Sequence, residues 1–129
     1  MSLQGHLTEA RLVITEYLTS KNIPLQMRNR KLIEVKAGQA WGRLSHLSYS
    51  STNVCLGASE IRDRGSIVVS LFFPLGSGAT LADTVSYELR DLLSQKFFGA
   101  LETGIGEVIE VPTTEDFFHL NVYIPFRHN

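Results

Sequence analysis

Residues 67–73, with the sequence IVVSLFF, constrain the fold more than any other part of the chain. Side chains alternate between the two faces of a strand, so Ile67, Val69, Leu71 and Phe73 point one way and Val68, Ser70 and Phe72 the other. A strand this apolar must be covered on both faces, and one helix cannot cover both. We therefore predict a central strand, with its second face covered by a further layer or by another copy of the chain.

Two segments show the spacing of amphipathic helices, and we expect both helices to pack on the same sheet. The first is predicted over residues 7–19, and Pro24 follows its end. The second is predicted over residues 80–97, where Thr80 and Asp83 resemble a capping box. Its predicted buried stripe consists of Leu81, Val85, Leu89, Leu92 and Leu93.

The remaining pattern predicts strands and turns. Strands are expected at residues 41–49, 107–111 and 117–126, with short extended segments at 23–27 and 32–35. Residues 50–53 are predicted to be a connector. Residues 54–61 are predicted to be an extended arm of a hairpin whose turn lies at residues 62–65, because Asp63 and Gly65 are residue types that favour turns. The chain is thus predicted to be one α+β domain over residues 1–129. It should contain a mostly antiparallel mixed sheet of four to six strands with two helices packed on it.

Composition limits the functional classes. The 129 residues contain 12 Lys and Arg against 13 Asp and Glu, a formal charge of −1, so no basic footprint for nucleic acid is present. The small cluster Arg28, Arg30 and Lys31 is expected to be a solvated loop or a protein contact. The single Cys55 excludes an internal disulfide, and no secretory signal or membrane-spanning run is seen. We expect a soluble protein made in the cytoplasm, with no membrane partner.

The search for catalytic and metal-binding motifs finds none, so no catalytic, cofactor-binding or metal-binding residue is predicted. Cys55 would need His46 or His119 as a base to act as a nucleophile, and a small buried residue is the better interpretation. The four histidines lack metal-ligand spacing. The glycines of residues 76–78 lack the lysine of a nucleotide loop. We expect a solvated or partner-facing acidic patch at Glu107, Glu110, Glu115 and Asp116.

The order of these features resembles the tail terminator proteins of long-tailed phages. The resemblance spans nearly the whole chain: a first helix, the segment IPLQMRN, a WGRLSHL strand, the LG-x4-RDRG turn, the SIVVSLFFPLGSG strand and turn, a second helix and the closing FFHLNVYIPFR strand. Its sharpest parts are residues 62–65, 73–78 and 122–127. None of these is chemically unique, so the match depends on order, length and context.

The resemblance implies a structural, non-enzymatic protein without cofactors. Such a protein forms a homo-oligomeric ring, usually of six subunits, that caps the tail tube and ends its polymerisation. It also offers a surface for joining to the head. Its implied partners are the tail tube protein and a head completion protein, without sequence-specific binding to nucleic acid. It would be assembled in the host cytoplasm and end in the virion tail.

Ring closure needs two different patches that meet head to tail. The two-sided central strand and Trp41 offer surplus apolar surface for one patch. Arg62 and Arg64 could meet Glu107, Glu110 or Glu115 of a neighbour, and an ion pair within one chain is an equal alternative. The candidate interface residues are Trp41, Arg62, Arg64, Val68, Phe72, Glu107 and Glu110.

Two other functional classes are weaker alternatives. One is a small α+β regulatory domain that binds an anionic metabolite at residues 76–78 and the start of the second helix. It lacks a phosphate-specific motif. The other is a thiol enzyme that uses Cys55 and a histidine, without any flanking motif to support it.

Overall fold

A computed structural model describes residues 3–27, 30–34, 38–53, 61–76, 79–114 and 117–128. Within these residues the chain forms two helices and a seven-stranded mixed sheet, which confirms the predicted α+β class and exceeds the four to six strands expected. In chain order the elements are α1 (Leu3–Ser20), β1 (Leu25–Gln26), β2 (Trp41–Asn53), β3 (Ile61–Pro74), α2 (Thr80–Leu93), β4 (Phe97–Phe98), β5 (Leu101–Thr103), β6 (Glu107–Thr114) and β7 (Phe117–His128).

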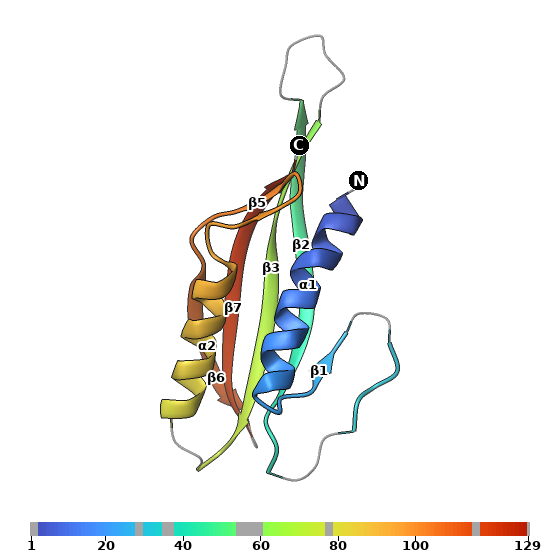
Figure 1. Cartoon of the computed structure of the whole chain (residues 1–129). Coiled ribbons are helices and arrows are strands. Elements are labelled where there is room, and N and C mark those ends of the chain that lie inside the picture. The colour runs from blue at the N-terminus through green and yellow to red at the C-terminus, as the bar shows by residue number, and fades with distance from the viewer. Residues whose placement is uncertain are drawn as a thin grey trace.

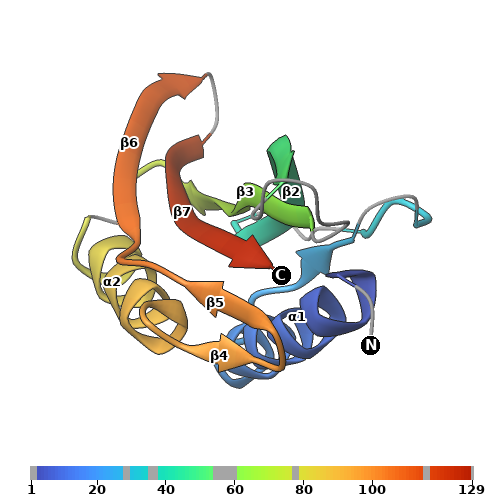
Figure 2. The same ribbon diagram turned by 90° about the horizontal axis from the view of Figure 1, so that it is seen from above.

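The sheet has the strand order β1-β2-β3-β7-β5-β4, and β6 also pairs with β7. The β1–β2 pair is parallel, and the other pairs are antiparallel. Both helices lie on the same face of the sheet, side by side along its length (Figure 1). Viewed from above, the sheet curves, and neither helix reaches its other face (Figure 2).

Strand β3 lies at the centre, between β2 and β7, as its apolar sequence predicted. Its residues Ile67, Val69, Leu71 and Phe73 are at most 2% exposed beneath the helices. The core residues that α1 contributes are Leu7, Ala10, Ile14 and Leu18, and those from α2 are Ala82, Val85, Leu89 and Leu93. The two helices therefore complete one hydrophobic core on one face of the sheet.

Helix α2 ends at Leu93, so the prediction that it continues to residue 97 was wrong. Gln95 adopts a positive φ of 54°, which ends the helix. Thr103 then fixes the turn, because its Oγ1 donates to the Leu93 carbonyl at 2.6 Å and accepts the Lys96 N–H at 2.8 Å. Phe97, at the predicted end of the helix, instead belongs to strand β4.

The predicted start and stripe of α2 also need correction. The N-cap residue is Ala79 and makes no side-chain cap hydrogen bond, so the capping box of Thr80 and Asp83 does not form. Leu81 and Leu92 are 56% and 40% exposed. The positions that complete the buried side of the helix are taken by the small residues Ala82 and Ser86.

The prediction of a hairpin turn at residues 62–65 was wrong, and the antiparallel pair is formed by β2 and β3 instead. Residues 62–65 belong to β3 and residues 50–53 to β2, where they pair with each other. Gly65 lies inside the sheet, opposite Ser48 on one side and Phe126 on the other. Strand pairing has thus overridden the local turn preference of the Asp-Arg-Gly sequence. The connection at residues 54–60, which includes Cys55, lies outside the described residues.

The short segments before β2 were predicted in part. Residues 23–27 contain the two-residue strand β1. No strand forms over residues 32–34, the described part of the segment 32–35. There the side chain of Gln26, which is 8% exposed, holds the loop by accepting the Ile33 N–H at 2.8 Å.

Replacing Leu89 tests the core assignment. Leu89 is 0% exposed, so Leu89→Ala is expected to lower the free energy of unfolding by roughly 2–5 kcal/mol. The matched control Leu81→Ala removes the same atoms from an exposed site and should cost only about 0.5 kcal/mol. Urea unfolding of both variants measures the difference. Equal losses would show that the buried side of α2 is wrongly assigned.

A buried histidine pair joins the first helix to the last strand. Nδ1 of His6 lies 2.7 Å from Nε2 of His128, and each residue is 7% exposed. Burial lowers the pKa of His128, the neighbouring His6 and the amino terminus lower it further, and Asp63 partly offsets them. His128 is therefore neutral near pH 7 in the folded chain.

This pair predicts a loss of stability in mild acid. The pKa of His128 is lower in the folded than in the unfolded chain, where it is about 6.5. Its contribution is therefore complete above about pH 6.5 and is lost as the pH falls through the folded pKa. The free energy of unfolding measured from about pH 7.5 down to about pH 5 should decrease, with a smaller slope in His128→Gln. Identical slopes would exclude His128 as the source.

Candidate functional site

The sheet face that α1 and α2 leave uncovered is the candidate functional site, and we call it the helix-free face. Strand alternation and register place its residues in rows across β2, β3, β7 and β6. From β2 and β3 they are Trp41, Arg43, Ser45, Arg62, Arg64, Ser66, Val68, Ser70 and Phe72. From β7 and β6 they are Phe117, His119, Asn121, Tyr123, Pro125, Arg127, Glu107, Ile109 and Val111.

One end of this face carries an aromatic cluster, formed by Trp41, Phe72, Phe117 and His119. The ring of Phe72 is stacked between Trp41 and His119, with centroid distances of 4.2 Å to each. Phe117 meets Trp41 and Phe72 edge to face, at 6.3 and 6.2 Å. The four rings are only half-buried, although they come from three adjacent strands. Such an arrangement presents a flat apolar surface with fixed geometry.

Polar side chains beside the cluster are held by one another. His119 Nε2 lies 2.8 Å from Asn121 Oδ1, and Asn121 Nδ2 donates to the Tyr123 hydroxyl at 3.1 Å. The guanidinium of Arg43 lies 5.8 Å from the centre of the Phe72 ring. Burial lowers the pKa of His119 and the nearby Arg43 lowers it further, while the Asn121 hydrogen bond partly offsets both. His119 is therefore neutral near pH 7 and belongs to the apolar surface.

The opposite end of the face carries arginines. Arg64 on β3 and Arg127 on β7 are directly opposite each other in the register. Glu102 on β5 accepts a hydrogen bond from Nε of Arg127 at 2.8 Å, and Nη2 of Arg127 lies 2.7 Å from the same carboxylate oxygen. These three residues line an open hollow of about 320 Å³. Glu102 neutralises Arg127, so the exposed Arg64 is the arginine that an anionic partner would meet at this end.

A second open hollow, of about 260 Å³, lies between the two ends. It is lined by Ser66, Ile105, Glu107, Ile109, Tyr123 and Pro125, and it shares Pro125 with the first hollow. Ile105 and Ile109 are 69% and 45% exposed. The helix-free face thus continues from aromatic to aliphatic to cationic surface along β7.

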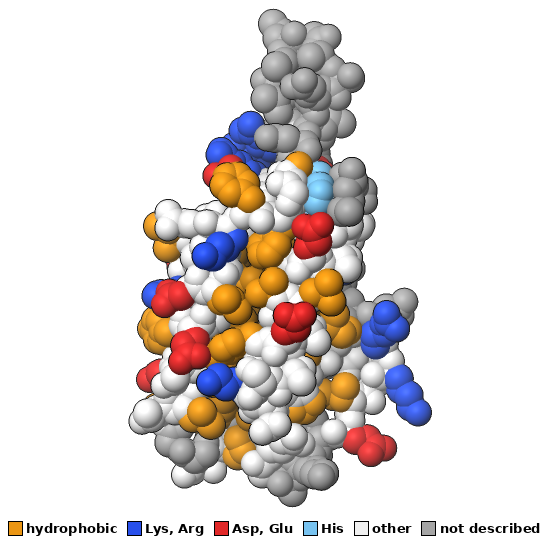
Figure 3. Space-filling model, in the orientation of Figure 1, with side chains coloured by type: hydrophobic (Ala, Val, Ile, Leu, Met, Phe, Trp, Pro, Cys, Tyr) orange, Lys and Arg blue, Asp and Glu red, His pale blue; other side chains and the backbone are white. Residues whose placement is uncertain are grey.

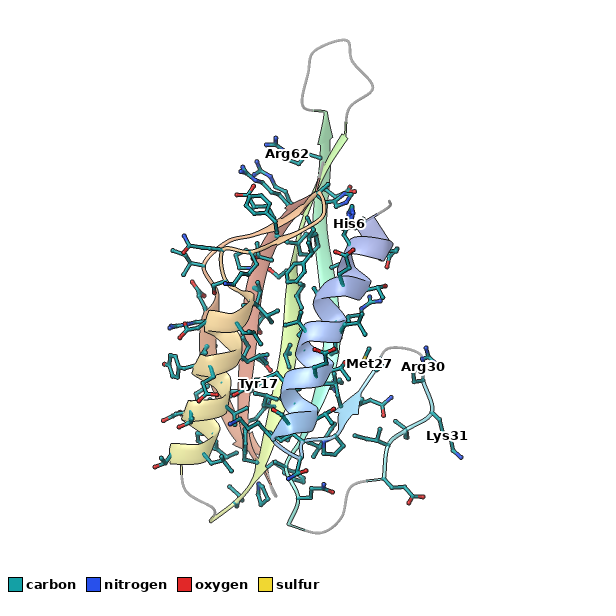
Figure 4. All side chains as sticks on the ribbon, in the orientation of Figure 1. His6, Tyr17, Met27, Arg30, Lys31 and Arg62 are labelled. Carbon is teal, nitrogen blue, oxygen red and sulfur yellow. The ribbon has the colours of Figure 1, made fainter. Side chains whose placement is uncertain are left out.

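The structure brings most predicted interface residues to this one face. Trp41 and Phe72 are in direct contact, and Val68 lies on the same face but is only 7% exposed. Arg62 and Arg64 lie near the first residue of β3, at the opposite end of the strand from Phe72. Arg62 is labelled in Figure 4. Glu107 shares the face. Glu110 is exposed and is paired with Leu120, which places it on the opposite face.

Sequence reasoning missed several residues of the helix-free face. These are Arg43, Phe117, His119 and Arg127. The alternation of β7 already separated His119, Asn121 and Tyr123 from the buried residues of that strand. The strand order was the missing information, because only pairing with β3 places His119 against Phe72 and Arg127 against Arg64.

The residues considered for chemistry do not form a described site. Cys55, Glu115, Asp116, Ser77 and Gly78 lie outside the described residues, as does the side chain of His46. Gly76 has a positive φ of 86°. No group of three His, Cys, Asp or Glu that could hold a metal ion occurs in the described part of the chain. Neither described helix is long and apolar enough to cross a membrane.

The single tryptophan reports on the aromatic cluster. Phe72→Ala removes the ring stacked on Trp41, so the indole should meet more water and its fluorescence emission should shift to longer wavelength. Ile109→Ala is a control on the same face, in a hollow that Trp41 does not line, and should leave the emission unchanged. An unchanged spectrum in Phe72→Ala would contradict the stacked arrangement.

Comparison with known proteins identifies the family. A solved structure that is 17% identical superposes with a TM-score of 0.69, over 100% of this chain and 96% of its own, which shows a shared fold. The comparison with curated proteins gives no match. The sequence profile of the phage tail terminator protein family matches residues 6–118, most of the chain. The chain therefore belongs to the phage tail terminator protein family.

Proposed function

We propose that this protein caps the end of the phage tail tube as a ring, ends tube polymerisation and provides the surface for joining to the head. Membership of the tail terminator family supports a structural role in the tail. The observation that carries the proposal is the aromatic cluster, in which four half-buried rings contact one another on a face that no described helix covers. A surface of this kind marks a protein contact.

A cap works by occupying the surface to which the next ring of tube protein would bind. A closed ring also presents one of its sides to the tube and the other to the head. We propose six copies, contacts to the tail tube protein on one side and to a head completion protein on the other. Head-to-tail contacts between two different patches close such a ring when the subunit rotation divides a full turn.

Charges on the helix-free face would set the orientation of these contacts. Arg64 is exposed, whereas the opposite Arg127 is paired with Glu102, so Arg64 is the arginine that a carboxylate from a neighbouring copy would meet. Arg62 lies on the same side of β3. The exposed Glu110, on the helix side of β6, is a candidate carboxylate of the neighbour, whereas Glu107 lies on the same face as the arginines. Exposed pairs of this kind govern encounter and orientation more than affinity.

The proposal predicts the length of tails. Adding the protein to a tail assembly reaction that lacks its own terminator should give tails of uniform length that join heads, whereas omitting it should give over-long tubes. Phe72→Glu places a charge in the aromatic cluster and should abolish capping. Leu32→Glu makes the same kind of change at an 82% exposed residue outside the cluster and should preserve it. Electron microscopy measures the length distributions.

Two outcomes would contradict the proposal. Normal tail lengths without the protein would place it elsewhere in the tail. Complete loss of capping in a stably folded Cys55→Ser variant would indicate thiol chemistry instead of a structural role, because the substitution removes the only sulfhydryl of the chain. Circular dichroism and urea unfolding of each variant show whether it is folded.

A further inference from the structure

We infer that the helix layer of one copy, with the outer side of α2 at its centre, covers the helix-free face of the next copy in the ring. This inference rests on the proposed ring and names the two surfaces that would form its repeated contact. Three properties of the molecule carry it: the one-sided coverage of the sheet, the opposite charges of its two sides, and the exposed side chains of α2.

The coverage of the sheet sets the geometry. The two helices cover one face only (Figure 2). The other face carries the aromatic cluster. A helix laid on that second face would complete the three-layer arrangement in which a sheet is covered on both sides. The helix layer and the helix-free face lie on opposite sides of the molecule. A contact between them is therefore head to tail, the type that closes into a ring.

The two sides of the molecule carry opposite charge. The helix layer, with the adjoining Lys21, has five carboxylates, Glu9, Glu16, Asp83, Glu88 and Asp91, against the three cations Arg11, Lys21 and Arg90, and Lys21 pairs with Glu88 at 3.8 Å. Figure 3 shows acidic side chains interspersed with apolar side chains over the two helices. The helix-free face, with the adjoining Glu102, has four arginines, Arg43, Arg62, Arg64 and Arg127, against Glu102 and Glu107. Opposite potentials favour contact between the two sides and disfavour contact between like sides.

The exposed side chains of α2 are chemically complementary to those of the helix-free face. Leu81, Tyr87 and Leu92 are 56%, 46% and 40% exposed, so α2 presents apolar side chains to solvent. Arg90 is neutralised by Asp91 at 2.7 Å and lies over the Tyr87 ring at 4.9 Å. Asp83 is exposed in the first turn and makes no ion pair with a described residue. The helix thus offers apolar side chains and a carboxylate to a face of aromatic rings and arginines.

Two half-blocked variants test this contact. The sheet variant, Arg43→Glu with Arg64→Glu, reverses the charge of the helix-free face at two exposed residues. The helix variant, Asp83→Arg with Thr84→Arg, reverses the charge on the outer side of α2, also at two exposed residues. Each variant alone should remain a monomer. An equimolar mixture should form heterodimers and larger mixed species, because each pair retains one intact contact and the other contact brings exchanged but still opposite charges together.

Sedimentation over rising protein concentration and native mass spectrometry measure these species, and circular dichroism shows that the variants are folded. A helix variant that assembles like the wild type would overturn the inference, since α2 would then lie outside the contact. A mixture without any heterodimer would overturn it as well. If the charge variants misfold, Tyr87→Glu and Phe72→Glu replace them in the same mixing experiment.

Tail tubes separate this inference from the proposed function. If wild-type protein binds tube ends but the helix variant caps equally well, the ring stands and the helix contact is wrong. If wild-type protein never binds tube ends, the proposed function is wrong whatever the mixing experiment shows. If the wild type is a monomer in solution, the inference is tested on tail tubes instead. There the number of copies bound per tube end can be counted for the wild type and for each variant.

Discussion

The architecture depends on the central position of β3. This strand pairs along its length with β2 on one side and with β7 on the other. Its side chains therefore contribute to both faces of the sheet. The helices cover Ile67, Val69, Leu71 and Phe73 and complete the core of one chain. The other face keeps Phe72 and its stacked neighbours. The difference between the two faces follows from the alternation of this one strand.

Small side chains explain why the middle of the helix-free face needs little cover. Ser66, Val68 and Ser70 are 5%, 7% and 5% exposed. On β7, Tyr123 lies beside Val68 and Asn121 beside Ser70. The large side chains lie towards the two ends, with the aromatic cluster at one and Arg64 and Arg127 at the other. The surface therefore offers two separated anchor points, which fix the orientation of a bound partner better than one central patch.

Sequence reasoning succeeded where local pattern and burial agree. The alternation of β3 predicted its central place, and the helical spacing of Val85 and Leu89 predicted α2. It failed where tertiary contacts decide. Phe97 continues the apolar spacing of α2, but the Thr103 hydrogen bonds end the helix earlier and draw Phe97 into a strand too short to show a pattern. The arginine end was found only in part, because Arg127 joins Arg64 through the strand order.

The complete core of a single chain bears on how a ring would be controlled. Because its own helices bury the core, one copy can fold without a neighbour, and contact between copies need contribute nothing to folding. The helix-free face has open hollows and polar side chains that bond to each other, as in the row of His119, Asn121 and Tyr123. Such a surface is ordered before binding, so little conformational entropy is lost when a partner covers it. A weak contact between free copies would then become a closed ring where the tube end holds them side by side.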